Sequence, residues 1–161
     1  MNEINYRWST LADYPALIAI ENQIWNEQNT PIPTHYDHVS DYQKHFQPGS
    51  QLVAVIDGQP VGMISFNPTP PFAAFRFTWD IGIGVDPAYQ DQGIGSGLLN
   101  VLKLEAQKKN IHKIKLNVLG TNPQARAFYL KNGFVEEGHS RDIFFLAGQF
   151  VDDYSLAYFV D

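Results

Sequence analysis

Residues 90–97 read Gln90-Asp91-Gln92-Gly93-Ile94-Gly95-Ser96-Gly97 and separate a stretch typical of a strand from one typical of a helix. Gly93 and Gly95 have no Cβ, so the backbone here can approach a ligand closely. The helix that follows presents unpaired N–H groups and the positive end of its dipole, which together favour phosphate. Simple turn chemistry is the commoner explanation of a glycine cluster, so an anion site needs a second motif to support it.

Two known phosphate motifs fit this stretch poorly. A P-loop needs the pattern Gly-x-x-x-x-Gly-Lys-Ser/Thr, and residues 90–97 contain no lysine. A dinucleotide-binding fingerprint needs Gly-x-Gly-x-x-Gly near the start of a parallel sheet, whereas the spacing here is Gly93-x-Gly95-x-Gly97. The glycine cluster therefore requires another explanation.

A second motif, Asn122-x-x-Ala125-x-x-x-Tyr129-x-x-x-Gly133-Phe134, lies about thirty residues downstream of the first. The first motif in full is Val85-Asp86-Pro87-x-Tyr89-Gln90-x-Gln92-Gly93-Ile94-Gly95-x-Gly97-Leu98-Leu99. In this order and at this spacing, the pair resembles the acyl-CoA signature and the second motif of the GNAT superfamily of N-acetyltransferases. The sequence departs from the family at Asp91, where glycine is usual. Aspartate tolerates unusual backbone angles better than most residues, so the turn can form.

The hydrophobic pattern predicts a mixed chain of strands and helices. Expected strands cover 4–8, 51–56, 61–66, about 75–85 and 113–118, with a C-terminal hairpin around Ala147-Gly148; expected helices cover about 13–25, 34–46, 98–110 and 122–131. Asp57-Gly58 predicts a tight hairpin turn, and Asn122-Pro123 predicts a helix start. The expected fold is α/β (α+β). It is a single GNAT-type domain over residues 1–161, with a twisted, mixed, mostly antiparallel sheet of about seven strands and about four helices.

Composition and charge exclude several classes of protein. The 161 residues carry a formal net charge of −6, which argues against a nucleic-acid binder, and the absence of cysteine excludes disulfides and cysteine nucleophiles. No apolar run is long enough for a membrane span or signal peptide, so we expect a cytoplasmic protein. Residues 86–141 carry a net charge of +3, whereas residues 1–85 carry −5 and residues 142–161 carry −4. This distribution suits an anionic cofactor beside a cationic substrate, and a solvated lysine face explains it as well.

The resemblance implies that acetyl-CoA is the acyl donor and that an amine attacks its thioester directly in a ternary complex. By analogy, the backbone of Ile83, Gly84 and Val85 pairs with the pantetheine arm, and Asn122 contacts the cofactor near that arm. The amides that would hold the pyrophosphate belong to Gln90, Asp91, Gln92, Gly93, Ile94, Gly95 and Ser96. Tyr129 would lie by the sulfur as general acid, although a core aromatic beside Phe128 is the alternative. No metal is implied, and the five histidines show no metal-ligand spacing.

The chemistry also needs a proton acceptor. An amine with a pKa of about 10.4 is free base in roughly one molecule in 2,500 at pH 7. Asp80 is the carboxylate that we expect to accept this proton. The alternative interpretation of Asp80 is an acid on the surface or paired with a neighbouring strand. The C-terminal stretch from Glu136 to Asp152 resembles that of GNAT members acting on polyamines, other small amines or protein N-termini. The expected partner is therefore a small-molecule or peptide amine. Formation of a homodimer through C-terminal strands is a further expectation. The alternative function is a non-catalytic acyl-CoA sensor or partner-binding module on the same fold. A third possible function is an O-acyltransferase or an enzyme that transfers longer acyl groups.

Overall fold

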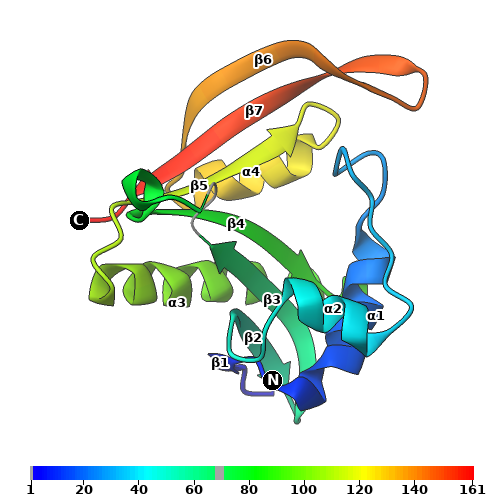
Figure 1. Ribbon diagram of the computed structural model, residues 1–161, viewed down its shortest axis with the longest axis vertical. Coiled ribbons are helices and arrows are strands. Elements are labelled where there is room, and N and C mark those ends of the chain that lie inside the picture. Colours follow the sequence, from blue (N-terminus) through cyan, green and yellow to red (C-terminus); the bar gives the residue numbers. More distant parts are fainter. Residues whose placement is uncertain (1, 68–70) are drawn as a thin grey trace. The chain divides into compact units, whose positions relative to one another are not determined.

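The computed structural model describes residues 2–67 and 71–161, and these ranges form seven strands and four α-helices (Figure 1). The strands are β1 (Asn5–Trp8), β2 (Gln51–Ile56), β3 (Gln59–Asn67), β4 (Thr78–Val85), β5 (Lys113–Leu119), β6 (Val135–Leu146) and β7 (Gln149–Phe159). The helices are α1 (Tyr14–Ile24), α2 (Val39–His45), α3 (Ile94–Lys108) and α4 (Pro123–Lys131), with short 3-10 turns η1 (Leu11–Asp13), η2 (Ala73–Phe75) and η3 (Pro87–Tyr89). Within the described residues, each helix is too short or too polar to cross a bilayer.

The seven strands form one sheet in the order β1-β2-β3-β4-β5-β7-β6. β4 and β5 pair in parallel, whereas β1–β2, β2–β3, β5–β7 and β6–β7 pair antiparallel. The predicted mixed, mostly antiparallel sheet with four helices is therefore confirmed. Contacts divide the chain into two compact units: unit 1 is Met1–Ile24, Thr34–Phe66 and Ile81–Ala106, and unit 2 is Trp25–Pro33, Asn67–Asp80 and Gln107–Asp161.

Unit 1 has a core on each face of its strands. On one face, α1 and α2 bury a cluster against β2 and β3, made of Tyr14, Leu17, Ile20, Tyr42, Val53, Val55 and Met63. On the other face lies α3, since a Cβ added to Gly62 would approach Ile94 and Leu98 at 3.2 and 3.4 Å. The alternation of side chains along a strand explains this arrangement, because Gly62 and Met63 are neighbours and point to opposite faces.

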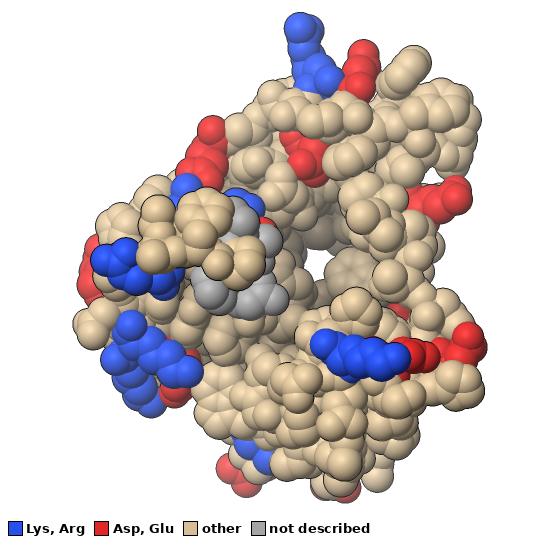
Figure 2. All heavy atoms as spheres, in the orientation of Figure 1, with Lys and Arg blue, Asp and Glu red and all other residues tan. Residues whose placement is uncertain are grey.

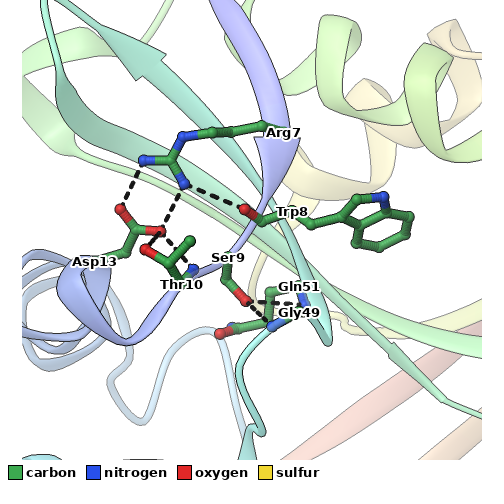
Figure 3. A network of polar contacts seen from close by, with 7 residues as sticks. All are labelled: Arg7, Trp8, Ser9, Thr10, Asp13, Gly49 and Gln51. Atoms are coloured by element: carbon green, nitrogen blue, oxygen red, sulfur yellow. Dashed lines mark hydrogen bonds and ion pairs between the residues drawn. The ribbon is translucent and has the colours of Figure 1, made fainter.

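The start of α1 is fixed by a polar network (Figure 3). The Arg7 guanidinium donates two hydrogen bonds to the Asp13 carboxylate, at 2.7 and 2.8 Å, and the Thr10 backbone N–H donates a third at 2.8 Å. Next to them, the Ser9 hydroxyl and carbonyl accept from the Gly49 N–H at 3.1 and 2.8 Å. These bonds tie β1 to η1 and to the turn before β2.

Unit 2 contains the start of β4, the strands β5, β7 and β6, and α4. Its core includes Ile114, Leu116 and Val118 from β5, which alternate with polar residues as the sequence predicted. α4 adds Tyr129, whose ring lies 5.4 Å from that of Phe134, and Phe134 in turn lies 5.7 Å from Tyr158. The long β6–β7 hairpin (orange and red in Figure 1) continues the sheet beyond β5.

Two helices and one strand differ from the sequence prediction in extent. α2 begins at Val39 rather than near residue 34, because Tyr36 bonds through its N–H and carbonyl with the side chain of Asn22 at 2.8 Å each, which holds this segment out of a helix. α3 begins at Ile94 rather than 98, so Gly95 and Gly97 belong to its first turn. β4 begins at Thr78, since η2 occupies residues 73–75.

The predicted turns and caps are confirmed. Asp57 and Gly58 have φ of +50° and +79°, as a two-residue hairpin turn of this kind requires, and Ala147 and Gly148 repeat the pattern between β6 and β7. The Asn122 side chain accepts a hydrogen bond from the Ala125 N–H at 3.3 Å, and Pro123 occupies the first helical position. These local signals need no tertiary contact, which is why the sequence reveals them.

Candidate functional site

The glycine-rich turn leads directly from η3 into α3 in unit 1. The Asp86 N–H donates to the Val61 carbonyl at 2.8 Å, and the Asp86 carboxylate accepts from the Ala88 N–H at 2.9 Å. Asp91 and Gly93 then adopt left-handed conformations with φ of +60° and +79°. Asp91 therefore adopts a positive φ, the conformation that glycine takes most readily, and the turn forms with aspartate at this position.

The first turn of α3 supplies the groups that can hold an anion. The Gly97 N–H donates to the Gly93 carbonyl at 2.9 Å, which begins the helical ladder. The preceding N–H groups have no partner inside the helix and point along its axis, where the dipole favours negative charge. Residues 90–93 are exposed and Gly95 and Ser96 half-buried, so the turn is accessible to a ligand. The Asp91 carboxylate opposes this attraction with its own negative charge.

Gly97 and Gly84 have a packing role that sequence reasoning missed. A Cβ on Gly97 would lie 1.8 Å from the Tyr6 hydroxyl, so α3 packs directly against the phenol of β1. A Cβ on Gly84 would lie 2.5 Å from Ile24 Cδ1 and 3.0 Å from Met63 Sδ, so β4 passes close beneath α1. Both contacts join segments distant in sequence, and no local pattern identifies them.

Tyr129 lies on α4 in unit 2 among aromatic rings. Its ring contacts those of Phe128 and Phe134 at 5.2 and 5.4 Å, and only 6% of the residue is exposed. The hydroxyl has no hydrogen-bond partner among the described residues. Burial raises the pKa of this phenol well above its ordinary value, so it stays protonated and remains a donor at neutral pH. The side chain is thus a core aromatic beside Phe128, which was the alternative to its role as general acid, and its O–H remains available as a donor.

Asn122 lies at the start of the same helix. Its side-chain oxygen accepts from the Ala125 N–H and so caps α4. Its amide N–H groups have no partner in the part of the chain that the structure describes. The residue can therefore cap the helix and donate to a ligand at once.

Asp80 lies at the end of the parallel β4–β5 ladder, opposite Lys115. Its carboxylate forms an ion pair with the Lys115 Nζ at 3.1 Å. The residue thus has the geometry of a strand-paired acid, which was the alternative to its role as proton acceptor. The pairing is tertiary, since 35 residues separate the two partners.

Lys115 begins a line of polar side chains along one face of β5 and β7. Its Nζ also donates to Asn117 Oδ1 at 3.4 Å, and Asn117 Nδ2 donates to Asp153 Oδ2 at 2.7 Å and to Ser155 Oγ at 3.2 Å. We call Asp80, Lys115, Asn117, Asp153 and Ser155 the polar row. Burial raises the pKa of Asp153, against smaller lowering effects of the Asn117 hydrogen bond and the Lys115 charge. Sequence reasoning missed Asp153, although the Asp152-Asp153 pair was visible.

A histidine and an acid also meet on the β6–β7 hairpin. His139 Nε2 lies 2.8 Å from Asp152 Oδ2, and the imidazole stacks on Tyr154 at 4.3 Å. The Asp142 N–H donates to the other Asp152 oxygen at 2.8 Å, so Asp152 holds the irregular part of β6. In residues 2–67 and 71–161, no three His, Asp or Glu side chains gather in a way that could hold a metal ion.

The predicted site residues thus form two sets. Unit 1 contains Ile83, Gly84, Val85 and residues 90–96, which are brought together at the end of β4 and the start of α3. Unit 2 contains Asp80, Asn122 and Tyr129. Acidic and basic side chains lie in small separate groups on the face seen in Figure 2.

Known proteins similar to this chain include acetyltransferases. A model of the Acetyltransferase (GNAT) family matches residues 16–134. The spermidine N(1)-acetyltransferase of Vibrio cholerae is 30% identical over 112 residues, which make up 69% of this chain and 65% of the Vibrio protein, so the match spans less than two thirds of that relative. The ribosomal protein bS18-alanine N-acetyltransferase of Escherichia coli K12 is 30% identical over 122 residues, 71% of this chain and 82% of that protein. The crystal structure of smu.2055 from Streptococcus mutans UA159 superposes with a TM-score of 0.88 at 30% identity and 99% coverage of both chains.

Proposed function

The chain belongs to the GNAT family of acetyltransferases and is an acyl-CoA-dependent N-acyltransferase, and from this premise we propose that it moves the acetyl group of acetyl-CoA to a primary amine by direct attack in a ternary complex. The observation that carries the proposal is the Tyr129 hydroxyl, an uncommitted donor at the position where the family motif has its general acid. The rival reading, an acyl-CoA sensor, gives this unpartnered hydroxyl no role.

The residues present fit the cofactor. The left-handed backbone at Asp91 and Gly93 and the free N–H groups of the first turn of α3 suit a pyrophosphate, with Asp91 as the one opposing charge. The backbone of Ile83, Gly84 and Val85 would pair with the pantetheine arm, and the free amide of Asn122 would donate to the cofactor. Acetyl-CoA supplies an activated acetyl group and a thiolate leaving group.

Tyr129 serves the leaving sulfur as a hydrogen-bond donor. A phenol with a pKa near 10 is a weaker acid than a thiol of about 8.5, and burial raises the pKa of Tyr129 further. Full proton transfer from Tyr129 to the sulfur is therefore uphill. A hydrogen bond that strengthens as negative charge grows on the sulfur is the contribution this side chain makes.

The acceptor proposed is a cationic amine. The relatives named for spermidine and for a ribosomal-protein alanine act on primary amines of two different sizes. In this chain Asp142, Asp152 and Asp153 lie on the β6–β7 hairpin, and no lysine or arginine follows residue 141. This negative segment favours an acceptor that arrives as an ammonium ion.

The test uses acetyl-CoA binding and thiol release in parallel. Calorimetry measures the affinity for acetyl-CoA, and a thiol reagent follows turnover with spermidine, small diamines and a peptide that begins with alanine. We expect Tyr129→Phe to lower kcat by about 100-fold with an acetyl-CoA affinity within about twofold of wild type. Tyr154→Phe, in the same unit, is the matched control and should keep its activity. Binding of acetyl-CoA without thiol release for any amine would favour the sensor.

A further inference from the structure

The polar row contains two carboxylates with different partners. Asp80 is neutralised by Lys115 at 3.1 Å. Asp153 accepts only from the Asn117 amide, at 2.7 Å, and no cation contacts it among the described residues. Lys115 forms its ion pair with Asp80 and acts on Asp153 only through space, so the row carries one net negative charge, and Asp153 is its acid without an ion pair.

The surroundings of Asp153 suit a cation. The carboxyl is half-buried beside the β5 strand, and Leu119 is its register partner. A charge that is partly removed from water and has only neutral donors gains free energy when an opposite charge arrives. The raised pKa of Asp153 has this same cause, and it also makes the group a better proton acceptor than an ordinary aspartate.

Strand register places Asp153 apart from the Asp80–Lys115 pair. The β4–β5 ladder runs from Thr78↔Lys113 to Asp80↔Lys115. β5 continues beside β7 to the pair Leu119↔Asp153, four residues beyond Lys115. Side chains alternate along a strand, so residues 115, 117 and 119 of β5 share one face with Asp153 of β7. Asn117 lies between the two acids and is bonded to Lys115 and to Asp153.

We propose that Asp153, and not Asp80, receives the ammonium group of the acceptor and takes up its first proton, while Asp80 is a positioning residue that holds Lys115. The inference rests on the proposed amine acetylation. The ammonium nitrogen gives one proton to the Asp153 carboxylate, which passes it to solvent. The freed lone pair forms the new C–N bond as the C–S bond breaks. The second N–H proton is lost as the amide forms and ends on the sulfur, which leaves as the thiol.

The first experiment compares two isosteric variants, Asp153→Asn and Asp80→Asn. We expect Asp153→Asn to lower kcat/KM for the best amine of the panel by about 100-fold or more, the usual effect of losing a general base. The acetyl-CoA affinity by calorimetry should stay within about twofold. Asp80→Asn should lower kcat/KM by less than about fivefold. Equal losses in the two variants, or a loss confined to Asp80→Asn, would overturn the proposal.

A second experiment measures amine binding to the wild-type protein, so it depends neither on catalysis nor on the folding of a variant. Carbon-detected NMR of the wild-type protein follows the side-chain carboxyl resonances of Asp153 and Asp80 during a titration with spermidine at millimolar concentration. A saturable shift at Asp153 with little change at Asp80 supports the proposal, and a shift at Asp80 alone contradicts it. If no amine is acetylated but Asp153 still binds spermidine, the acetyl-transfer step fails and the ammonium site stands.

Discussion

Replacing Gly97 by alanine tests how α3 is held against β1. The new Cβ would lie 1.8 Å from the Tyr6 hydroxyl and 2.6 Å from Cζ of the same ring, far inside van der Waals contact. Overpacking of this kind costs about 1–3 kcal/mol, and the overlap here places Gly97→Ala in the upper part of that range. Alanine regains about 1 kcal/mol over glycine in a helix. We therefore expect a net loss of about 2 kcal/mol in the free energy of unfolding.

The assay is urea denaturation of a double-mutant cycle. Tyr6→Leu removes the ring that Cβ would strike, so the double variant should recover about 1–2 kcal/mol relative to the sum of the single losses. Tyr6→Phe should recover less, because Cζ stays 2.6 Å from the added Cβ. Gly82→Ala is the matched control, since a Cβ there meets nothing within 4 Å and stability should not fall. A Gly97→Ala protein as stable as wild type, or the absence of coupling with Tyr6→Leu, would refute the packing argument.

Two further predictions concern charge. Asp91→Gly should tighten acetyl-CoA binding about three- to tenfold in calorimetry, because two unit charges of the pyrophosphate about 8 Å from the Asp91 carboxylate repel that carboxylate by about 1 kcal/mol in water. The matched variant is Asp57→Asn, which changes another aspartate with positive φ (+50°) and should leave the affinity for acetyl-CoA unchanged. Equal affinities of Asp91→Gly and wild type would contradict the proposed position of the pyrophosphate at this turn. Asp13→Asn should lower the free energy of unfolding by about 1–2 kcal/mol at pH 7, since Arg7 holds the folded-state pKa of the Asp13 carboxyl below 3.8. A carboxyl whose pKa is lower in the folded state stabilises the protein at pH values above its unfolded-state pKa, and this stabilisation is lost as the pH falls through its folded-state pKa. The difference in the free energy of unfolding between wild type and Asp13→Asn, measured in urea, should therefore shrink below about pH 4. A difference that grows on acidification would be inconsistent with the Arg7–Asp13 pair.

Local chemistry made much of the fold predictable. Asp57-Gly58 needs only its own backbone angles to form a hairpin, and Asn122-Pro123 needs only the first turn of α4. The sequence pattern predicts the start of α3 four residues late, because Gly95 and Gly97 are typical turn residues, whereas the buried Ile94 already belongs to the helix. α2 was predicted too long, since the Asn22 side chain that holds Tyr36 is 14 residues away.

The candidate site was less predictable where its contacts are tertiary. The family motif predicts roles for Tyr129 and for the turn at residues 90–96, whereas the ion pair of Asp80 joins residues 35 positions apart in the sequence, which no local pattern indicates. The bond between Asn117 and Asp153 spans 36 residues and depends on the register of β5 and β7. The alternation of Lys113, Lys115 and Asn117 showed that β5 has a polar face, and it gave no sign of which acids would meet that face.

Acetyl-CoA binding followed by amine-dependent thiol release in the same sample tests the central claim most directly. We expect wild-type protein to bind acetyl-CoA and to release thiol only when a primary amine is added, at a rate that Tyr129→Phe lowers by about 100-fold. Failure to bind acetyl-CoA at millimolar concentration, in wild type and in Asp91→Gly alike, would contradict the proposed cofactor site. Binding with no amine-dependent release would contradict acetyl transfer and leave an acyl-CoA sensor.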